Sequence, residues 1–425
     1  MNNSSINQPV IRPGGLSLRV NFSWTFAGNV VYAASQWGIL IVLSKLGTPE
    51  IVGQFALALA VTAPIFMFAN LKLRSVQATD ALDEYLFGEY LGLRLLTTVI
   101  GFGIVGVVSI LAGYDLYVIA LILLIGLAKS VESVSDICYG LFQKVERMDQ
   151  TARSLIWRGT VALVVMALLL FWTGNILYGA AGLVLVWFTV FWLHDIPQSR
   201  LILGGGIQQG MLRGLSRHKL LQLAWLALPL GVTMFLVSLN TNIPRYFAEA
   251  SLGSAALGVY AAIAYIQAAG STFVEALGAS INARMAHYYA AQNRGAYFKL
   301  LMRLVGISSL LALGGITAAA LFGKPLLTLL YRAEYADQTL FLLLMIAAGM
   351  SYIASALNHA MTAARRYRVQ VPIFGAVTLS VVAVCAWAVP RYGLYGAAAA
   401  QGVGMSVQVL ASLLVVVAAM RKAKV

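Results

Sequence analysis

The sequence predicts an all-α protein that crosses a membrane many times. Only 10% of the 425 residues are charged and 60% are hydrophobic, whereas soluble domains carry about 25% charged residues. Hydrophobic runs long enough to span a bilayer as helices recur along the whole chain. The two halves of the chain also resemble each other. We therefore predict about 12 transmembrane helices in two six-helix lobes related by a parallel pseudo-repeat.

The apolar runs define the expected helices and the boundary between the lobes. The widest polar gap, residues 194–219, contains three consecutive glycines and is interpreted as a cytoplasmic linker. It separates an N-terminal lobe, residues 1–193, from a C-terminal lobe, residues 220–425. The helices are expected at 20–44, 52–71, 91–113, 116–142, 154–173, 176–193, 220–247, 256–279, 298–322, 338–360, 371–390 and 393–419.

The basic residues predict the orientation in the membrane. If the N-terminus is cytoplasmic, all but six of the 29 lysines and arginines fall on or near the cytoplasmic side. Lys129 lies within a span, and the other five are Lys45, Arg245, Lys324, Arg332 and Arg391. The positive-inside rule therefore predicts that both termini are cytoplasmic. The net charge of +14 is explained by this topology and by anionic lipids, and no nucleic acid partner is expected.

Short matches in the same order support the repeat. "LGTPEIVGQFALALAV" (46–61) resembles "LGSAALGVYAAIAYI" (252–266), because both read Leu-Gly, a short turn, then Gly, any residue, an aromatic residue and Ala. "YLGLRLL" (90–96) matches "KLLMRLV" (299–305), and "FQKVER" (142–147) matches "AARRYR" (363–368). Six helices in each half give the halves the same orientation, so a transport site is expected between them.

The first helix of each half carries a polar stripe at three- and four-residue steps. Lipid cannot satisfy such side chains, so they either line a cavity or form hydrogen bonds between helices. The stripes comprise Asn21, Thr25, Asn29, Tyr32 and Gln36 in the first helix, and Ser238, Thr241, Asn242 and Arg245 in the seventh. The candidates for substrate binding are Asn29, Tyr32, Gln36, Asn242 and Arg245.

Pro244 bears on the role of Arg245. Because proline lacks the backbone donor, it is expected to free the carbonyl of Asn240 and to loosen or end the helix there. Arg245 would then be held at a helix break in the outer half of the membrane. Two interpretations remain, a cavity residue or an arginine that reaches the outer interface.

Four charged residues are candidates for coupling to an ion or a proton. Lys129, Glu132 and Asp136 share one face of the fourth helix. They form either an internal ion pair on a cytoplasmic extension of that helix or an ion site facing the cavity. Glu275 lies deep in the eighth helix without a local partner, so it requires protein or water around it.

Motifs for catalysis, metals or cofactors are missing from the sequence. "GFGIVG" (101–106) lies inside a spanning run, where small residues serve helix packing. The four histidines have no ligand spacing, and no P-loop or nucleophile elbow occurs. We therefore expect no catalytic residues, no metal site and no cofactor, and hence a protein that is not an enzyme.

Several stretches resemble the polysaccharide-transporter family of O-antigen and capsule-unit flippases, within the multidrug/oligosaccharidyl-lipid/polysaccharide flippase superfamily. The resemblance covers most of the chain. It is carried by "NTNIPRYFAEASLGSAALGVYAAIAYI" (240–266), "GNVVYAASQWGILIVLSKLGTPEIVGQFALALAV" (28–61), "NLKLRSVQATD" (70–80) and "FGEYLGLRLL" (87–96).

The resemblance implies a flippase of the bacterial cytoplasmic membrane that works by alternating access. Its substrate would be an oligosaccharide unit on a polyprenyl diphosphate, moved from the inner to the outer leaflet. The implied partners are membrane lipids, a polysaccharide polymerase and chain-length proteins. Two alternatives remain. An ion-coupled antiporter for small organic cations would be expected to line its cavity with carboxylates, whereas a cavity lined mainly by cations would favour the flippase. A non-transporting membrane partner of polysaccharide enzymes is the third interpretation.

Overall fold

The predicted all-α membrane fold is confirmed. The structure is a computed structural model that describes residues 15–80, 82–203, 216–366 and 369–422, and within these ranges it contains helices and no strands. The helices are α1 (Leu18–Leu46), α2 (Pro49–Ala69), α3 (Leu73–Thr79), α4 (Phe87–Leu111), α5 (Leu116–Lys144), α6 (Met148–Thr173), α7 (Ile176–Val190), a π-helix (Phe191–Asp195), α8 (Ile196–Ile202), α10 (Arg217–Ala290), α11 (Arg294–Leu330), a 3-10 helix (Ala333–Tyr335), α12 (Gln338–Ala363), α13 (Gln370–Tyr392) and α14 (Leu394–Lys422).

Eleven of the described helical segments are long and apolar enough to cross a membrane. One of them, α10, is 74 residues long and is interrupted at Gly253, where φ is 81° and ψ is 175°. A positive φ strains most residues but not glycine. Gly253 therefore divides α10 into two limbs, residues 217–252 and 254–290, which correspond to the seventh and eighth predicted helices.

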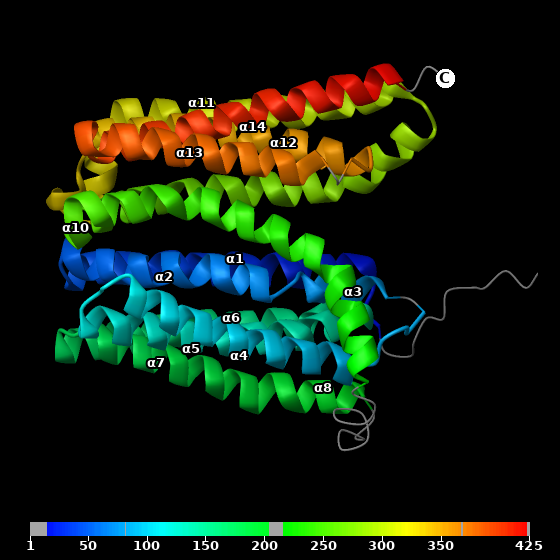
Figure 1. The fold of residues 1–425 in the computed structure, drawn as a ribbon, viewed down its shortest axis with the longest axis horizontal. Helices are drawn as coiled ribbons and strands as arrows, with labels where there is room; N and C mark the ends of the chain where they lie inside the picture. Colours follow the sequence, from blue (N-terminus) through cyan, green and yellow to red (C-terminus); the bar gives the residue numbers. More distant parts are fainter. Residues whose placement is uncertain (1–14, 81, 204–215, 367–368, 423–425) are drawn as a thin grey trace, which may run out of the picture.

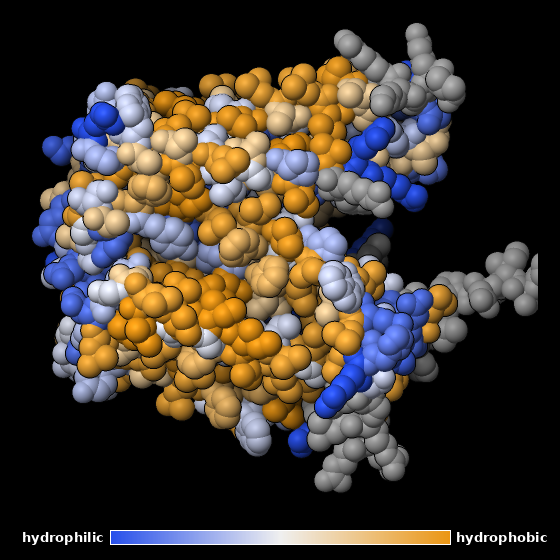
Figure 2. All heavy atoms as spheres, in the orientation of Figure 1, coloured by the Kyte–Doolittle hydropathy of each residue, from blue (hydrophilic) through white to orange (hydrophobic). Residues whose placement is uncertain are grey.

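The helices form two groups that lie side by side (Figure 1). One group contains α1, α2 and α4–α7, and the other contains α11–α14. The first limb of α10 begins beside α3 and crosses to the far end of the bundle. A belt of hydrophobic surface lies between hydrophilic patches at the two ends of the molecule (Figure 2). Large apolar side chains such as Val99, Leu310 and Leu414 are exposed, as expected for helices that face lipid.

Most helices extend beyond their predicted limits. α6 begins at Met148 rather than at 154, and α11 continues to Leu330 rather than to 322. Polar first turns and Pro325 lie in these extensions, so hydrophobicity alone placed the ends too far inside the helices. The short helix α3 was not predicted, because it is neither long nor apolar enough to span a bilayer.

The prediction that the helix loosens or ends at Pro244 is wrong. The first limb of α10 continues through Pro244 to Leu252. Pro244 and its neighbour Ile243 are buried, as is Ala248 one turn further on, and packing on both sides keeps the segment helical despite the missing donor. Arg245 therefore lies within a helix, and the break occurs at Gly253.

The division into lobes joined by a linker at 194–219 stays a prediction. Helical structure continues from α7 through the π-helix and α8 to Ile202, and α10 begins at Arg217, so both ends of the proposed linker are helical. Residues 204–215, which include the three glycines, lie outside the described residues.

Candidate functional site

A polar cavity of about 950 Å³ lies inside the membrane-spanning bundle. It is enclosed by both limbs of α10, by α12, α13 and α14, and by the corner that follows α2. Figure 2 shows the molecule hollowed between its two groups of helices at the end where the C-terminus lies. The amide and hydroxyl side chains that line the cavity are Thr233, Asn240, Thr241, Asn282, Ser351, Ser355, Asn358, Thr362, Gln370 and Gln408. Thr233 and Thr241 donate to carbonyls of their own helix, and Asn240 is bonded to α13. Asn282 Oδ1 and Asn358 Oδ1 are buried without a partner among the described residues, so they require water or a polar ligand.

Three ionisable residues also line this cavity: Lys72, Glu275 and His359. Glu275 Oε1 accepts a hydrogen bond from Ser355 Oγ, and His359 Nε2 lies 3.2 Å from Glu275 Oε2. The carboxylate therefore has partners on α12, which sequence inspection did not find because they are about 80 positions away in the chain. Lys72 and His359 were missed for the same reason: their role depends on tertiary contact.

Asn242 and Arg245 form a local pair on the first limb of α10. Arg245 Nη1 donates to Asn242 Oδ1 at 3.1 Å, and Asn242 Nδ2 donates to the Ser238 carbonyl at 2.8 Å. Arg245 Nε is buried and has no partner among the described residues. Neither residue lines the polar cavity, whereas Thr241 of the same stripe does.

The polar stripe of α1 divides into two parts. Asn29 is exposed and donates to the carbonyl of Thr25 at 2.8 Å, so it satisfies its own helix. Tyr32 Oη donates to Glu132 Oε1 at 3.0 Å, which links α1 to α5. Gln36 Nε2 is buried and lacks a partner within the part of the chain that the structure describes.

The charged face of α5 is engaged inside the first group of helices. Lys129 Nζ lies 2.7 Å from Glu132 Oε2, as the ion-pair interpretation expected. Lys129 also lies over the ring of Trp187, with 5.7 Å to its centroid.

Asp136 forms a different network. It pairs with Arg94 at 3.2 Å and with Arg74 at 3.5 Å, and the fully buried Arg94 also donates to the side chain of Asn70. A second buried pair, Arg158 and Asp195, is 3.3 Å apart. Sequence analysis did not identify the two arginine partners of Asp136. A buried charge must be paired, so these networks hold helices of the first group together.

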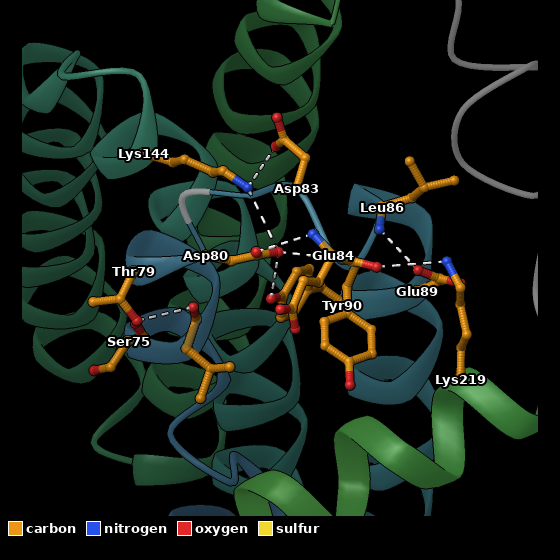
Figure 3. A network of polar contacts seen from close by, with 12 residues as sticks. Ser75, Thr79, Asp80, Asp83, Glu84, Leu86, Glu89, Tyr90, Lys144 and Lys219 are labelled. Atoms are coloured by element: carbon orange, nitrogen blue, oxygen red, sulfur yellow. Dashed lines mark hydrogen bonds and ion pairs between the residues drawn. The ribbon is translucent and has the colours of Figure 1, made fainter. Parts of the chain in front are cut away.

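A network of charged and polar side chains ties the beginning of α10 to the first group of helices (Figure 3). Lys219, near the start of α10, lies 3.5 Å from Glu89 at the start of α4. Close by, Lys144 pairs with Asp83 at 2.7 Å and with Asp80 at 3.7 Å. The beginning of α10 is therefore bound to the first group, while the rest of the helix packs both on α2 and on α12 and α13.

No family model matches the chain. A curated relative is the capsular polysaccharide biosynthesis protein CapF of Staphylococcus aureus, which is 29% identical over 381 residues, or 89% of this chain and 94% of the relative. The chain is a homologue of a capsular polysaccharide biosynthesis protein.

Solved structures with the same fold are transporters of the superfamily that the sequence resembles. The lipid II flippase MurJ, in an inward closed conformation, matches with a TM-score of 0.72 at 12% identity, over 94% of this chain and 87% of MurJ. An inward-facing multidrug resistance transporter of the MATE family matches with a TM-score of 0.65 at 14% identity, over 98% of both chains. An outward-facing multidrug resistance transporter of the MATE family matches with a TM-score of 0.56 at 14% identity, over 95% of this chain and 96% of the transporter. These likenesses establish the fold of two six-helix lobes.

Proposed function

We propose that the protein is a flippase that moves a lipid-linked oligosaccharide from the inner to the outer leaflet of the bacterial cytoplasmic membrane. The polar cavity of about 950 Å³ is the observation that carries this proposal. Amides and hydroxyls hydrogen-bond sugar hydroxyls, and a hydrocarbon tail can remain in the bilayer while the sugars cross. The homologue in capsule biosynthesis and the MurJ fold support the same assignment.

The cavity also bears on the two alternatives. It is lined neither mainly by cations nor mainly by carboxylates, because Lys72 and Glu275 are outnumbered by neutral amides and hydroxyls. An exporter of organic cations would require more negative charge than the one glutamate, which His359 already faces. Neutral hydrogen-bonding walls favour a glycan. A non-transporting partner of polysaccharide enzymes needs no such cavity.

The proposed orientation has both termini in the cytoplasm and the cavity open on that side. It rests on the distribution of basic residues and on the hollow that the molecule shows at the end where the C-terminus lies (Figure 2). In this arrangement the substrate enters from the inner leaflet, and rocking of the lobes exposes it outside. A polysaccharide polymerase and chain-length proteins would act on the unit after its transfer.

Transport can be tested with purified protein in liposomes. A fluorescent polyprenyl-diphosphate oligosaccharide is added to both leaflets, and a membrane-impermeant reductant bleaches the outer one. We expect the protein to raise the bleached fraction from about half toward completion, while a fluorescent phosphatidylcholine stays half protected. Equal bleaching with and without protein would reject the flippase and leave the non-transporting partner.

Arg245 is proposed to contribute positive charge on the outer side of the cavity, one helical turn beyond Thr241. Its partnerless Nε and its contact with Asn242 support this role. Losing a charged hydrogen bond costs about 1.5–3 kcal/mol, or roughly ten- to a hundredfold in binding. Arg245→Ala should cripple polysaccharide export at normal expression, and Arg245→Lys should restore it only in part, because lysine lacks the planar fork. Wild-type export from the alanine variant would refute the role.

A further inference from the structure

An apolar groove of about 470 Å³ lies between α2, α4 and the first limb of α10. Its walls are leucine, isoleucine, alanine and aromatic side chains, including Phe68, Ile104 and Trp225, with one threonine. Trp225 and Ile104 are exposed although they are large and apolar, as expected for a surface that faces lipid. The groove therefore has the shape and chemistry to receive a hydrocarbon chain.

The groove and the polar cavity lie on opposite sides of the same stretch of helix. Leu221, Leu228 and Phe235 of α10 line the groove, whereas Thr233 and Val237 line the cavity. One helix thus separates an apolar compartment from a polar one. A molecule with a long apolar chain and a polar head could occupy both compartments by passing around this helix.

The corner after α2 joins the two compartments. Leu71 lines the groove, and the next residue, Lys72, lines the cavity. Both have left-handed backbone conformations, with φ of 47° and 53°, which are uncommon for residues other than glycine and persist only where the surroundings hold them. Arg94 provides that support, because it binds the side chain of the preceding Asn70 and pairs with Asp136.

Helix α10 passes very close to this corner. A Cβ at Gly231 would lie 2.7 Å from Leu71 Cδ2 and 3.1 Å from the Phe68 carbonyl oxygen, so only glycine fits without a shift. The corner is therefore held firmly between α4 and α10. A lysine held at the boundary between an apolar and a polar compartment is well placed to bind a charged group that joins the apolar chain of an amphiphile to its polar head.

Lys72 is the one lysine or arginine among the described residues that line the cavity. It has no ion-pair partner within 4.0 Å in the described part of the chain, although Glu275 and His359 face the same space. Lysine is a common phosphate ligand, and a diphosphate is the part of a lipid-linked sugar that lies between chain and glycan.

We propose that Lys72 binds the diphosphate of a lipid-linked substrate whose hydrocarbon chain lies in the groove and whose sugars enter the cavity. This inference rests on the proposed function. Lys72 lies at the end of the molecule that is proposed to face the cytoplasm, so it makes the first contact, before the substrate reaches Arg245 one helical turn beyond the cavity residue Thr241. The apolar chain stays on the lipid side of α10 throughout.

Binding of geranylgeranyl diphosphate to the full-length protein in nanodiscs tests the assignment. We expect Lys72→Ala to weaken binding about tenfold or more, because it removes a charged contact, while Lys72→Arg retains most of it. Ile104→Trp, which fills the groove, should weaken the binding of geranylgeranyl diphosphate but leave the binding of inorganic pyrophosphate, which has no chain, unchanged. Lys299→Ala is the matched control, because Lys299 is exposed on α11 and lines neither compartment.

Two results would overturn the assignment: unchanged binding to Lys72→Ala, or equal displacement of the probe by phosphatidylglycerol, which would mean that the corner holds an ordinary anionic lipid. Photo-crosslinking of a benzophenone-bearing chain to the wild-type protein does not depend on the folding of a variant. It should label groove residues, and labelling spread evenly over the lipid-facing surface would also reject the proposal.

Normal transport by Lys72→Ala would reject this site and leave the proposed flippase function intact, whereas wild-type protein that transports nothing would reject the flippase function itself.

Discussion

The boundary between the two groups of helices is sealed at one end and hollow at the other. At the sealed end, Gly53 of α2 and Gly258 of α10 bring the two backbones into contact, and a Cβ on either would overlap a carbonyl oxygen of the other helix. Arg332 donates to the carbonyls of Gly47 and Lys45 across the boundary. At the hollow end, polar side chains line a cavity of about 950 Å³. Backbone contact closes one end, and side chains that need water or ligand keep the other open.

The seal uses the residues that define the internal repeat. Gly53 and Gly258 are the equivalent glycines of "GQFA" and "GVYA", and each repeat begins with a Leu-Gly pair that ends a helix or a limb, at Gly47 and Gly253. Two related segments therefore meet face to face. In an alternating-access cycle these contacts would have to part while the hollow end closes, and the predictions below test that exchange.

The largest effect is expected from Gly258→Leu. The added side chain meets the backbone of α2, and overpacking of a tight contact costs about 1–3 kcal/mol, so the seal should open. A reporter cysteine is placed at Ala56, which is buried on α2. In the Gly258→Leu protein this cysteine should react with a membrane-impermeant maleimide, whereas in the protein that keeps Gly258 it should stay protected. Gly306→Leu is the control, because a Cβ at Gly306 meets open space. Continued protection of the cysteine in Gly258→Leu would show that these glycines do not hold the seal.

A smaller effect is expected from Arg332→Ala. This change removes donors to two carbonyls at the sealed end, but it leaves the glycine contact intact. The two partly exposed bonds are together worth about 1 kcal/mol, so labelling of the same cysteine should rise roughly fivefold. Arg391→Ala should have no effect, because Arg391 donates to Trp387 of its own helix at 2.7 Å. An equal rise in both variants would assign the effect to general loosening.

The sealed end could be foreseen from the sequence better than the hollow one. The repeated glycines follow from local pattern, as does the all-α fold, and the charge distribution predicts an outer position for Arg332. Lys72 could not be found, because its importance depends on two left-handed residues and on α10 passing beside them. His359 meets Glu275 across 84 positions. Pro244 shows the converse error, since a local rule predicted a break that packing overrides.

Glu275→Gln should have the smallest effect on the seal and a selective effect on transport. Glu275 lies at the hollow end, so cysteine labelling at the sealed end should match the wild type. The pair with His359 is proposed to take up and release a proton during the cycle, and glutamine cannot do so. Transport in liposomes with an imposed proton gradient should therefore fall to the rate seen without one, at normal protein levels.

The histidine provides the matched comparison for this last prediction. If the two residues act as one proton site, His359→Gln should also remove the response to the gradient, and the double variant should be no worse than either single one, because residues that act as a unit are not additive. Ser355→Ala removes a hydrogen bond to Glu275 but no ionisable group, so it should keep the response. A Glu275→Gln protein that still responds fully to the gradient would exclude the proton role and leave Glu275 as a polar wall of the cavity. Loss of abundance without loss of coupling would instead assign Glu275 to holding α10 against α12.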